Sequence, residues 1–271
     1  MHKMLSKLHA VLYLACADDG IGKFDRSTAS QQSLMELFIF GLNEPEKICV
    51  SRDDPADVCE WKGAKCNADG EVEEFDWSWK RQDGTGTLGL EFLACSMKIV
   101  RMQRNSHSGT IQLADLPGKM ERVYLDRNQL TGSLDIDGLP ASVQTLNLSS
   151  NEFTGEVSLE HLPKGFKYLA LTENQLSGTI CLTALPPALD FMSLGKNKFE
   201  GSLDFTQLPK SIRSMSFRTN RFSGTIDVGN LPESMRLLDI SKNTLSGTVR
   251  VPQRPRIFIG GNEQLTVKRI E

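Results

Sequence analysis

An asparagine recurs every 23 residues through most of the chain, and a glycine follows each asparagine four residues later. Seven units in strict phase do not arise by chance, and a period of this length is typical of a solenoid, in which successive coils share one core. The spacing therefore restricts the fold more than any other feature does. The asparagines are Asn105, Asn128, Asn151, Asn174, Asn197, Asn220 and Asn243.

Each unit carries two alternating apolar segments, as "MRLLDISKNTLSGTVRV" (235–251) illustrates. The alternation before the asparagine predicts a short strand with one buried face, and the strands of successive units should pair in parallel. The alternation after the glycine predicts a second short strand, with the glycine permitting the turn between the two. Leu-Pro pairs such as Leu139-Pro140 separate the units and oppose helix formation.

The seven asparagines fall in the predicted core, where an unpaired amide would be costly. A column of stacked asparagines can instead bond to the backbone of its own coil and of the next one. We therefore expect a structural asparagine ladder, with each inner member contributing roughly 1–3 kcal/mol.

Segments such as "LLDISKNTLSGTV" and "LNLSSNEFTGEV" resemble leucine-rich repeats of the plant-type extracellular subclass, over about residues 97–251. The 23-residue unit and the absence of proline after the Gly-x-apolar motif depart from that subclass. The Leu-Pro spacer is similar to repeats of protist surface-antigen proteins. The resemblance implies a leucine-rich-repeat solenoid of the α/β horseshoe class: a curved right-handed superhelix of mostly short parallel strands with little helix.

The segment "CEWKGAKC" resembles the N-terminal cap of the same family, in which the residues matching Cys59 and Cys66 form a disulfide and Trp61 packs over the first coil. A zinc knuckle is the alternative, but no second cysteine or histidine pair lies nearby. Upstream, "STASQQSLMELFIFGL" predicts an amphipathic helix, capped by Thr28 or Ser30 and ended near Gly41. The pairing of Cys49, Cys95 and Cys181 stays open.

The sequence divides the chain into four predicted segments. Residues 1–17 read as a secretory signal, or else as the start of an ordinary helix, and 18–71 as the N-terminal cap. Residues 72–251 hold the repeats, and 252–271 form a short C-terminal repeat or cap, because Asn262 follows Asn243 by 19 residues. "GTGTLG" (84–89) matches a dinucleotide motif but lacks the βαβ context, so we expect a turn there.

Composition and motifs exclude several functions. The net charge of −3 gives no argument for nucleic acid, and no apolar run reaches the roughly 20 residues of a membrane span. The four histidines are scattered and no nucleophile motif is present. His107 takes an apolar position of its unit and is read as structural. We expect no enzyme activity, no cofactor and no metal.

The outward residues of the first strand of each unit should form the concave face of the coil. Aromatic and arginine side chains dominate binding hot spots, which points to a ligand surface of Arg101, Tyr124, Asp126, Tyr168 and Phe191. A solvated face with scattered aromatics is the alternative. We expect a secreted or cell-surface monomer that binds a protein or a glycan. An intracellular (cytoplasmic) scaffold and a structural coat protein remain open, as does glycosylation of Asn147 in "NLS".

Overall fold

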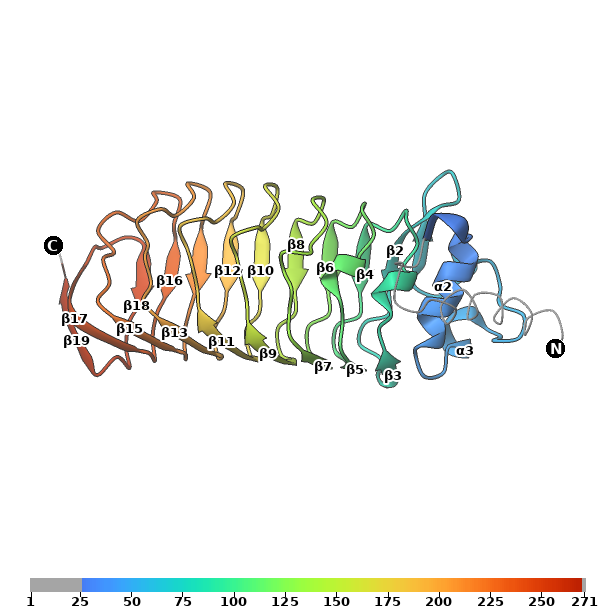
Figure 1. The fold of residues 1–271 in the computed structure, drawn as a ribbon, viewed down its shortest axis with the longest axis horizontal. Coiled ribbons are helices and arrows are strands. Elements are labelled where there is room, and N and C mark those ends of the chain that lie inside the picture. The colour runs from blue at the N-terminus through green and yellow to red at the C-terminus, as the bar shows by residue number, and fades with distance from the viewer. Residues whose placement is uncertain (1–25, 270–271) are drawn as a thin grey trace, which may run out of the picture.

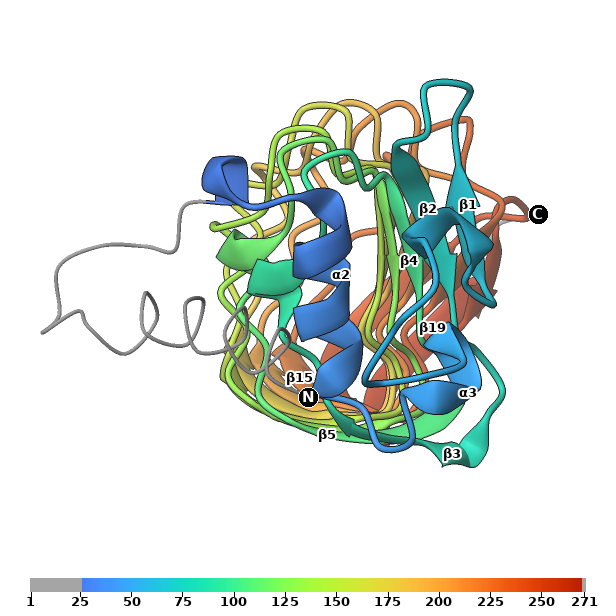
Figure 2. The same ribbon diagram turned by 90° about the vertical axis from the view of Figure 1, so that its right-hand side faces the viewer.

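The structure is a computed structural model that describes residues 26–269. The predicted signal segment, 1–17, lies outside the described residues. The chain forms an elongated solenoid with two long sheets on different sides of the coil (Figure 1). Seen along its axis, the ten-stranded sheet forms one wall, the nine-stranded sheet forms the adjoining wall, and irregular connections close the third side (Figure 2).

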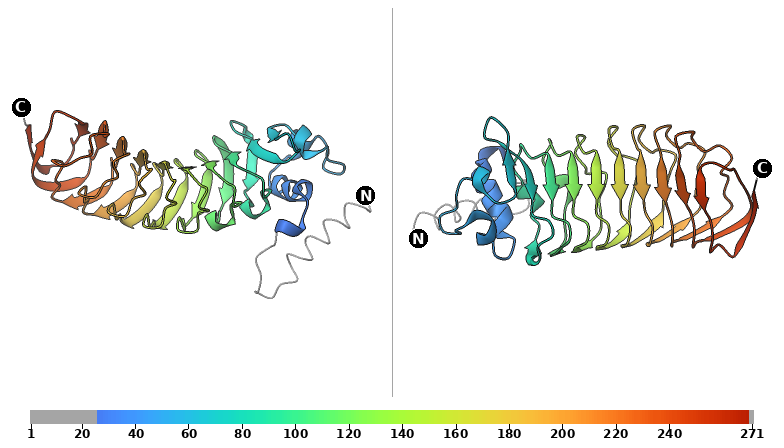
Figure 3. Two further views of the ribbon diagram at one scale, coloured as in Figure 1. Left: turned by 90° about the horizontal axis from the view of Figure 1, so that it is seen from above. Right: turned by 180° about the vertical axis from the view of Figure 1, so that it is seen from behind.

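The ten-stranded sheet contains the predicted first strand of every unit. The two strands nearest the N-terminus pair antiparallel, and all later pairs are parallel. The solenoid bends gently, with this sheet on the inner side of the bend (Figure 3). In spatial order the strands are β1 (Ala64–Cys66), β2 (Val72–Asp76), β4 (Ile99–Arg101), β6 (Arg122–Tyr124), β8 (Thr145–Asn147), β10 (Tyr168–Ala170), β12 (Phe191–Ser193), β14 (Ser214–Ser216), β16 (Leu237–Asp239) and β18 (Arg256–Phe258).

The nine-stranded sheet contains one strand per coil, but not where the sequence placed it. Most of these strands begin one residue after the asparagine and end at or just past the glycine, so the prediction of a strand after the glycine was wrong. The strands are β3 (Arg81–Thr87), β5 (Asn105–Gly109), β7 (Gln129–Gly132), β9 (Glu152–Glu156), β11 (Gln175–Thr179), β13 (Lys198–Gly201), β15 (Arg221–Gly224), β17 (Thr244–Val251) and β19 (Gln264–Arg269).

The turn between the two sheets depends on a different residue from the one predicted. The residue before each asparagine has positive φ, as at Arg127 (58°) and Ser150 (55°), and this left-handed residue redirects the chain. The glycine also has positive φ, 90° at Gly132, but it lies in the second strand. The regular hydrogen bonds of the coil hold a non-glycine residue in this unfavourable conformation in every unit.

The segment "GTGTLG" is also not the isolated turn that was expected. Its first four residues complete β3, which pairs in parallel with β5. Gly84 is packed so tightly that a Cβ there would lie 2.4 Å from the side chain of Asn105. At Gly86, a Cβ would lie 2.4 Å from the carbonyl oxygen of Gly41. The glycines thus allow the first coil to approach both the ladder and the N-terminal helix.

The asparagine side chains bridge neighbouring coils. Asn151, for example, donates from Nδ2 to the carbonyl oxygens of Leu148 in its own coil (3.0 Å) and Leu125 in the preceding coil (3.1 Å). Its Oδ1 accepts from the backbone N–H of Leu130 at 3.1 Å. All seven units repeat this role, and Asn262 continues it in the last coil. The ladder therefore connects the backbones along the whole array.

The N-terminal cap covers the first coil. The predicted helix is confirmed as α2 (Gln31–Phe40), with Ser30 accepting from the N–H of Ser33. Phe38 packs edge-to-face on Phe75, with ring centroids 5.8 Å apart. The other helical segments are α3 (Glu46–Cys49) and the 3-10 turns η1 (Arg26–Thr28), η2 (Val58–Glu60), η3 (Leu90–Phe92) and η4 (Leu113–Asp115).

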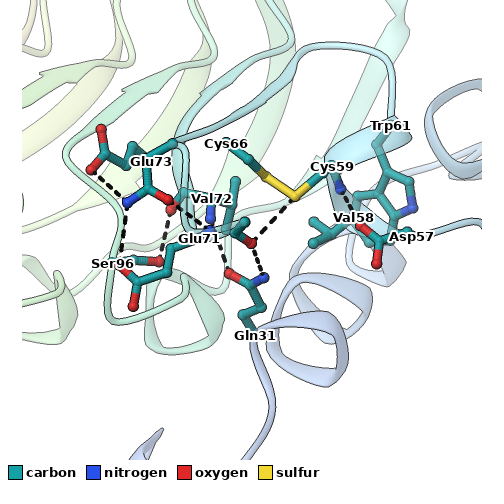
Figure 4. Close-up of a disulfide and its surroundings, with 12 residues drawn as sticks. Gln31, Asp57, Val58, Cys59, Trp61, Cys66, Glu71, Val72, Glu73 and Ser96 are labelled. Carbon is teal, nitrogen blue, oxygen red and sulfur yellow. Dashed lines mark hydrogen bonds between the residues drawn. A yellow bond between two sulfur atoms is a disulfide. The ribbon is translucent and has the colours of Figure 1, made fainter.

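The predicted disulfide between Cys59 and Cys66 is present in this cap (Figure 4). Trp61 is buried, and its Nε1 donates to the carbonyl oxygen of Ala56 at 2.8 Å. Gln31 links α2 to the first coil, because its side chain bonds to the backbone of Gly70 and Val72 (Figure 4). Among residues 26–269, Cys49 has a buried free thiol, and Cys95 and Cys181 have exposed ones.

Candidate functional site

The five residues predicted as a ligand surface lie on strands β4, β6, β10 and β12 of the ten-stranded sheet, with Asp126 just after β6. They are named here the ring patch (Arg101, Tyr124, Asp126, Tyr168 and Phe191). At its N-terminal edge, the Arg101 guanidinium lies 5.6 Å from the Tyr124 ring centroid and forms an ion pair with Glu74. All five side chains are only partly buried. They are therefore available for contact with a ligand.

Tyr168 and Phe191 form the aromatic part of the ring patch. They occupy equivalent positions on neighbouring strands, and their rings stack with centroids 4.4 Å apart and planes inclined by 7°. Burial raises the pKa of the Tyr168 phenol, and the nearby Asp126 and Tyr124 raise it further. The phenol therefore stays protonated at neutral pH and can donate a hydrogen bond to a ligand.

Asp126 supplies the carboxylate of the ring patch. Burial raises its pKa, and the nearby Arg127 and Arg104 act in the opposite direction. Its Oδ1 accepts a 2.9 Å hydrogen bond from Nδ2 of Asn147. Because Asn147 is the predicted glycosylation site, a glycan there would be attached to the nitrogen that contacts Asp126. Such a glycan would cover part of the ring patch.

The sequence reasoning missed a second aromatic and cationic pair beside the ring patch. Trp79 is 57% exposed, and the Arg104 guanidinium lies 3.8 Å from its ring centroid. The backbone N–H of Trp79 donates to the carbonyl oxygen of Gln103, which places it next to the coil that carries Arg101. The signal was hidden because the 23-residue phase is lost in the segment that contains Trp79.

The nine-stranded sheet carries a different kind of surface, also missed. The residue after the glycine is exposed in each of eight successive coils and is a hydroxyl residue in all of them but one, and we name this set the hydroxyl column. Its signal was present in the sequence as a second 23-residue periodicity. Its members are Thr87, Thr110, Ser133, Glu156, Thr179, Ser202, Thr225 and Thr248.

The glycines explain the uniformity of the hydroxyl column. A Cβ on Gly132, Gly201 or Gly247 would lie 2.9 Å from the Cγ2 methyl of the threonine in the preceding coil. These methyls therefore lie against the bare Cα of the next glycine. This contact restricts the threonine rotamers and orders the column.

Residues 26–269 contain no group of three or more histidine, cysteine or acidic side chains placed to hold a metal ion. His107 is completely buried, with its Nε2 3.1 Å from Nδ2 of Asn105, and burial lowers its pKa to about 4. In the same range, no helix has the length and hydropathy needed to cross a membrane.

Comparison with known proteins identifies the fold. No protein-family model and no curated protein sequence matches the chain. Among solved structures, pollen receptor kinase 3 is 17% identical with a TM-score of 0.51, covering 75% of this chain and 95% of that one. The leucine-rich-repeat ectodomain of the receptor kinase GASSHO1/SCHENGEN3 from Arabidopsis thaliana, in complex with CASPARIAN STRIP INTEGRITY FACTOR 2, is 16% identical with a TM-score of 0.50, covering 87% and 39%.

A plant ice-binding protein is also similar, with 18% identity, a TM-score of 0.52, and coverage of 89% of this chain and 84% of that one. Together with the nine-stranded parallel sheet and the ten-stranded, almost entirely parallel sheet, these matches confirm the predicted leucine-rich-repeat solenoid of the plant type at the level of fold.

Proposed function

We propose that the chain is a non-catalytic recognition protein that binds a protein or glycan ligand on the ring patch. The main observation behind this proposal is the set of neighbouring, partly exposed arginine, tyrosine, aspartate and phenylalanine side chains on the inner side of the bend. These residue types dominate interface energetics. The similar GASSHO1/SCHENGEN3 ectodomain was solved in complex with CASPARIAN STRIP INTEGRITY FACTOR 2, which supports ligand binding by this fold.

The test is a search for partners with the intact chain as bait, repeated with Tyr168→Ala/Phe191→Ala. A matched control, Thr131→Ala/Ser133→Ala, removes side chains from the nine-stranded sheet instead. We expect partners of the wild type to be retained by the control and lost by the ring variant. Partners kept by the ring variant would place binding elsewhere, and the proposal would fail.

We further propose that the protein acts outside the cell. The observation behind this proposal is the Cys59–Cys66 disulfide in the cap, because structural disulfides form in oxidising compartments. Expression in a secreting eukaryotic cell, followed by mapping of thiols in the medium and in the lysate, tests it. Secreted protein with an oxidised cap is expected. Reduced protein confined to the cytosol would instead favour the intracellular scaffold.

The hydroxyl column supports a second candidate function, binding to ice. Its parallel strands repeat about every 4.8 Å, so the ordered threonines hold hydroxyls and methyls in a regular array that can organise water. A similar fold occurs in a plant ice-binding protein. The column is interrupted by Glu156, and its longest unbroken run lies from Thr179 to Thr248.

Inhibition of ice recrystallisation tests this candidate. The wild type should inhibit growth of ice grains, Thr225→Lys should lose most of the effect, and Glu156→Thr should increase it by joining the two runs. Tyr168→Ala/Phe191→Ala serves as the control on the other sheet and should retain the activity. Equal ice growth with wild type, Thr225→Lys and buffer would remove the candidate.

A further inference from the structure

The Tyr168–Phe191 stack stands between two short side chains. Thr145 is the register partner of Tyr168 on one side, and Ser214 is the register partner of Phe191 on the other. Neither residue is large enough to cover an aromatic ring. The stack therefore has two outward ring faces: the Tyr168 face, beside Thr145, and the Phe191 face, beside Ser214.

Each ring face has a second wall one strand further along the sheet. Arg122 is the register partner of Thr145, so it stands opposite the Tyr168 face. Leu237 is the register partner of Ser214, so it stands opposite the Phe191 face. The two walls at each position are two strands apart, or about 9–10 Å, which accommodates one planar group in contact with both.

The side chains opposite the two ring faces differ in chemistry. Within residues 26–269, Arg122 forms no ion pair and no contact with an aromatic ring, so its guanidinium is available to stack on a ligand ring. At the Phe191 face, Leu237 offers only aliphatic surface. Arg218 and Arg236, on the neighbouring coils, likewise have no ion-pair partner among the described residues. The carboxylates near the stack already have partners, because Asp126 accepts from Asn147, Asp190 pairs with Arg213 and Asp239 accepts from Ser241. The charges that are left without an ion-pair partner are those of the arginines, which favours acidic ligand groups.

The separation of the two positions matches an extended chain. Thr145 and Ser214 are three strands apart, which is about 14 Å. In an extended peptide, residues i and i+4 are about 13–14 Å apart and point to the same side. We propose that the ring patch binds an extended acidic segment of a partner protein that inserts two planar side chains, four residues apart, at the Tyr168 and Phe191 faces.

This proposal rests on the proposed function and adds the ligand class. The probe is a library of random nine-residue peptides displayed on phage and selected on the whole chain. Enriched peptides should carry an aromatic residue followed by a second planar residue at i+4, with acidic residues between them. Synthetic versions with the same residues at i and i+3 should bind at least about tenfold more weakly. Absence of enrichment, or enrichment without this spacing, overturns the proposal.

Filling the two positions gives the sharper test. Thr145→Phe/Ser214→Phe extends the stack in both directions while leaving Tyr168 and Phe191 intact, and it should weaken binding of the enriched peptide at least about tenfold. Thr145→Ser/Ser214→Ala keeps both positions open and should bind as the wild type does. Circular dichroism confirms that each variant folds. Unchanged binding by the filled variant overturns the insertion.

Binding of the same peptide to both variants distinguishes failure of the insertion from failure of the proposed function. If Tyr168→Ala/Phe191→Ala loses binding but the filled variant keeps it, the ring patch remains the binding surface and only the insertion fails. If both variants bind as the wild type does, the ring patch is not the binding surface and the proposed function fails with it.

Discussion

The two sheets are built by the same repeats, yet their outward surfaces differ. On the nine-stranded sheet, the hydroxyl column repeats nearly the same residue type through eight successive coils. On the ten-stranded sheet, the equivalent positions vary in chemistry from coil to coil: Tyr124 is followed by Asn147, Ala170 and Ser193. A shared period therefore does not impose a shared surface.

Packing accounts for the uniform surface. Thr110, Thr179 and Thr225 fit closely against the glycine of the next coil, and Glu156 is the one longer side chain of the column that lies against such a glycine. The middle of the ten-stranded sheet has no such glycine, and its outward side chains meet only each other. The ten-stranded sheet can therefore vary without loss of the fold, and this freedom is what a recognition surface requires.

The largest predicted effect comes from the exception within the nine-stranded sheet. His107 points into the core where other coils have leucine or phenylalanine, as at Leu130 and Phe153. Its folded pKa is about 4, against an ordinary value of 6.5, so the unfolded chain takes up a proton first as the pH falls. Stability should decline from about pH 6.5 down to about pH 4, by about 3 kcal/mol.

Urea unfolding of wild type and His107→Leu at a series of pH values measures this loss. The variant should lack it, so the difference in unfolding free energy between the two proteins should grow as the pH is lowered. The variant should also be more stable at pH 7, because Nδ1 of His107 is buried without a partner among the described residues. Parallel pH profiles would show that His107 titrates normally.

The ladder joins the two sheets, and its loss should affect both surfaces. In Asn174→Ala, the backbone N–H of Phe153 and the carbonyl oxygens of Leu148 and Leu171 lose their partner. We expect a loss of about 2 kcal/mol in unfolding free energy, measured by urea denaturation. Asn230→Ala, at an exposed asparagine outside the ladder, is the control and should change stability little. Equal effects would contradict the ladder's role.

The sequence predicted the features that depend on periodicity and on local capping. The fold class, the helix after Ser30 and the cap disulfide were all confirmed. It misplaced the second strand, because the alternation of apolar residues continues past the glycine and gives no sign of where pairing stops. It also read "GTGTLG" as a turn, since the pairing of β3 depends on contacts with β5 and Gly41.

For the candidate site, the sequence placed the ring patch on one face but could not show its contacts. The Tyr168–Phe191 stack could have been predicted, because residues 23 positions apart become neighbours on the sheet. The hydrogen bond between Asp126 and Asn147 could not have been predicted, since it joins the residue after one strand to a strand of the next coil. Trp79 was missed because its segment has no repeat phase from which to infer a position.

The packing account of the hydroxyl column can be tested at two glycines. A Cβ at Gly201 would lie 2.9 Å from Cγ2 of Thr179, whereas a Cβ at Gly155 would meet Ser133 only at 3.5 Å. Both have positive φ. Gly155→Ala should therefore cost only the backbone strain, about 1 kcal/mol, and Gly201→Ala somewhat more.

Adding Thr179→Ser to Gly201→Ala removes the colliding methyl and should bring the cost down to that of Gly155→Ala. Thermal unfolding of the three variants gives the comparison. If Gly155→Ala and Gly201→Ala are equally destabilised, the column is not shaped by its contact with glycine, and its uniformity needs another cause.

The smallest expected effect is on the ten-stranded sheet, where the ring patch should matter little for stability. Tyr168 and Phe191 are partly exposed, so a double-mutant cycle with alanine should give a coupling of about 1 kcal/mol, the value for a stacked pair. Phe199 and Phe222 form a second stacked pair, but both are buried in the core, and Phe199→Ala supplies the reference for a structural aromatic. If Tyr168→Ala and Phe191→Ala destabilise the protein as strongly as Phe199→Ala does, the rings support the fold. In that case their presence on this face no longer argues for recognition.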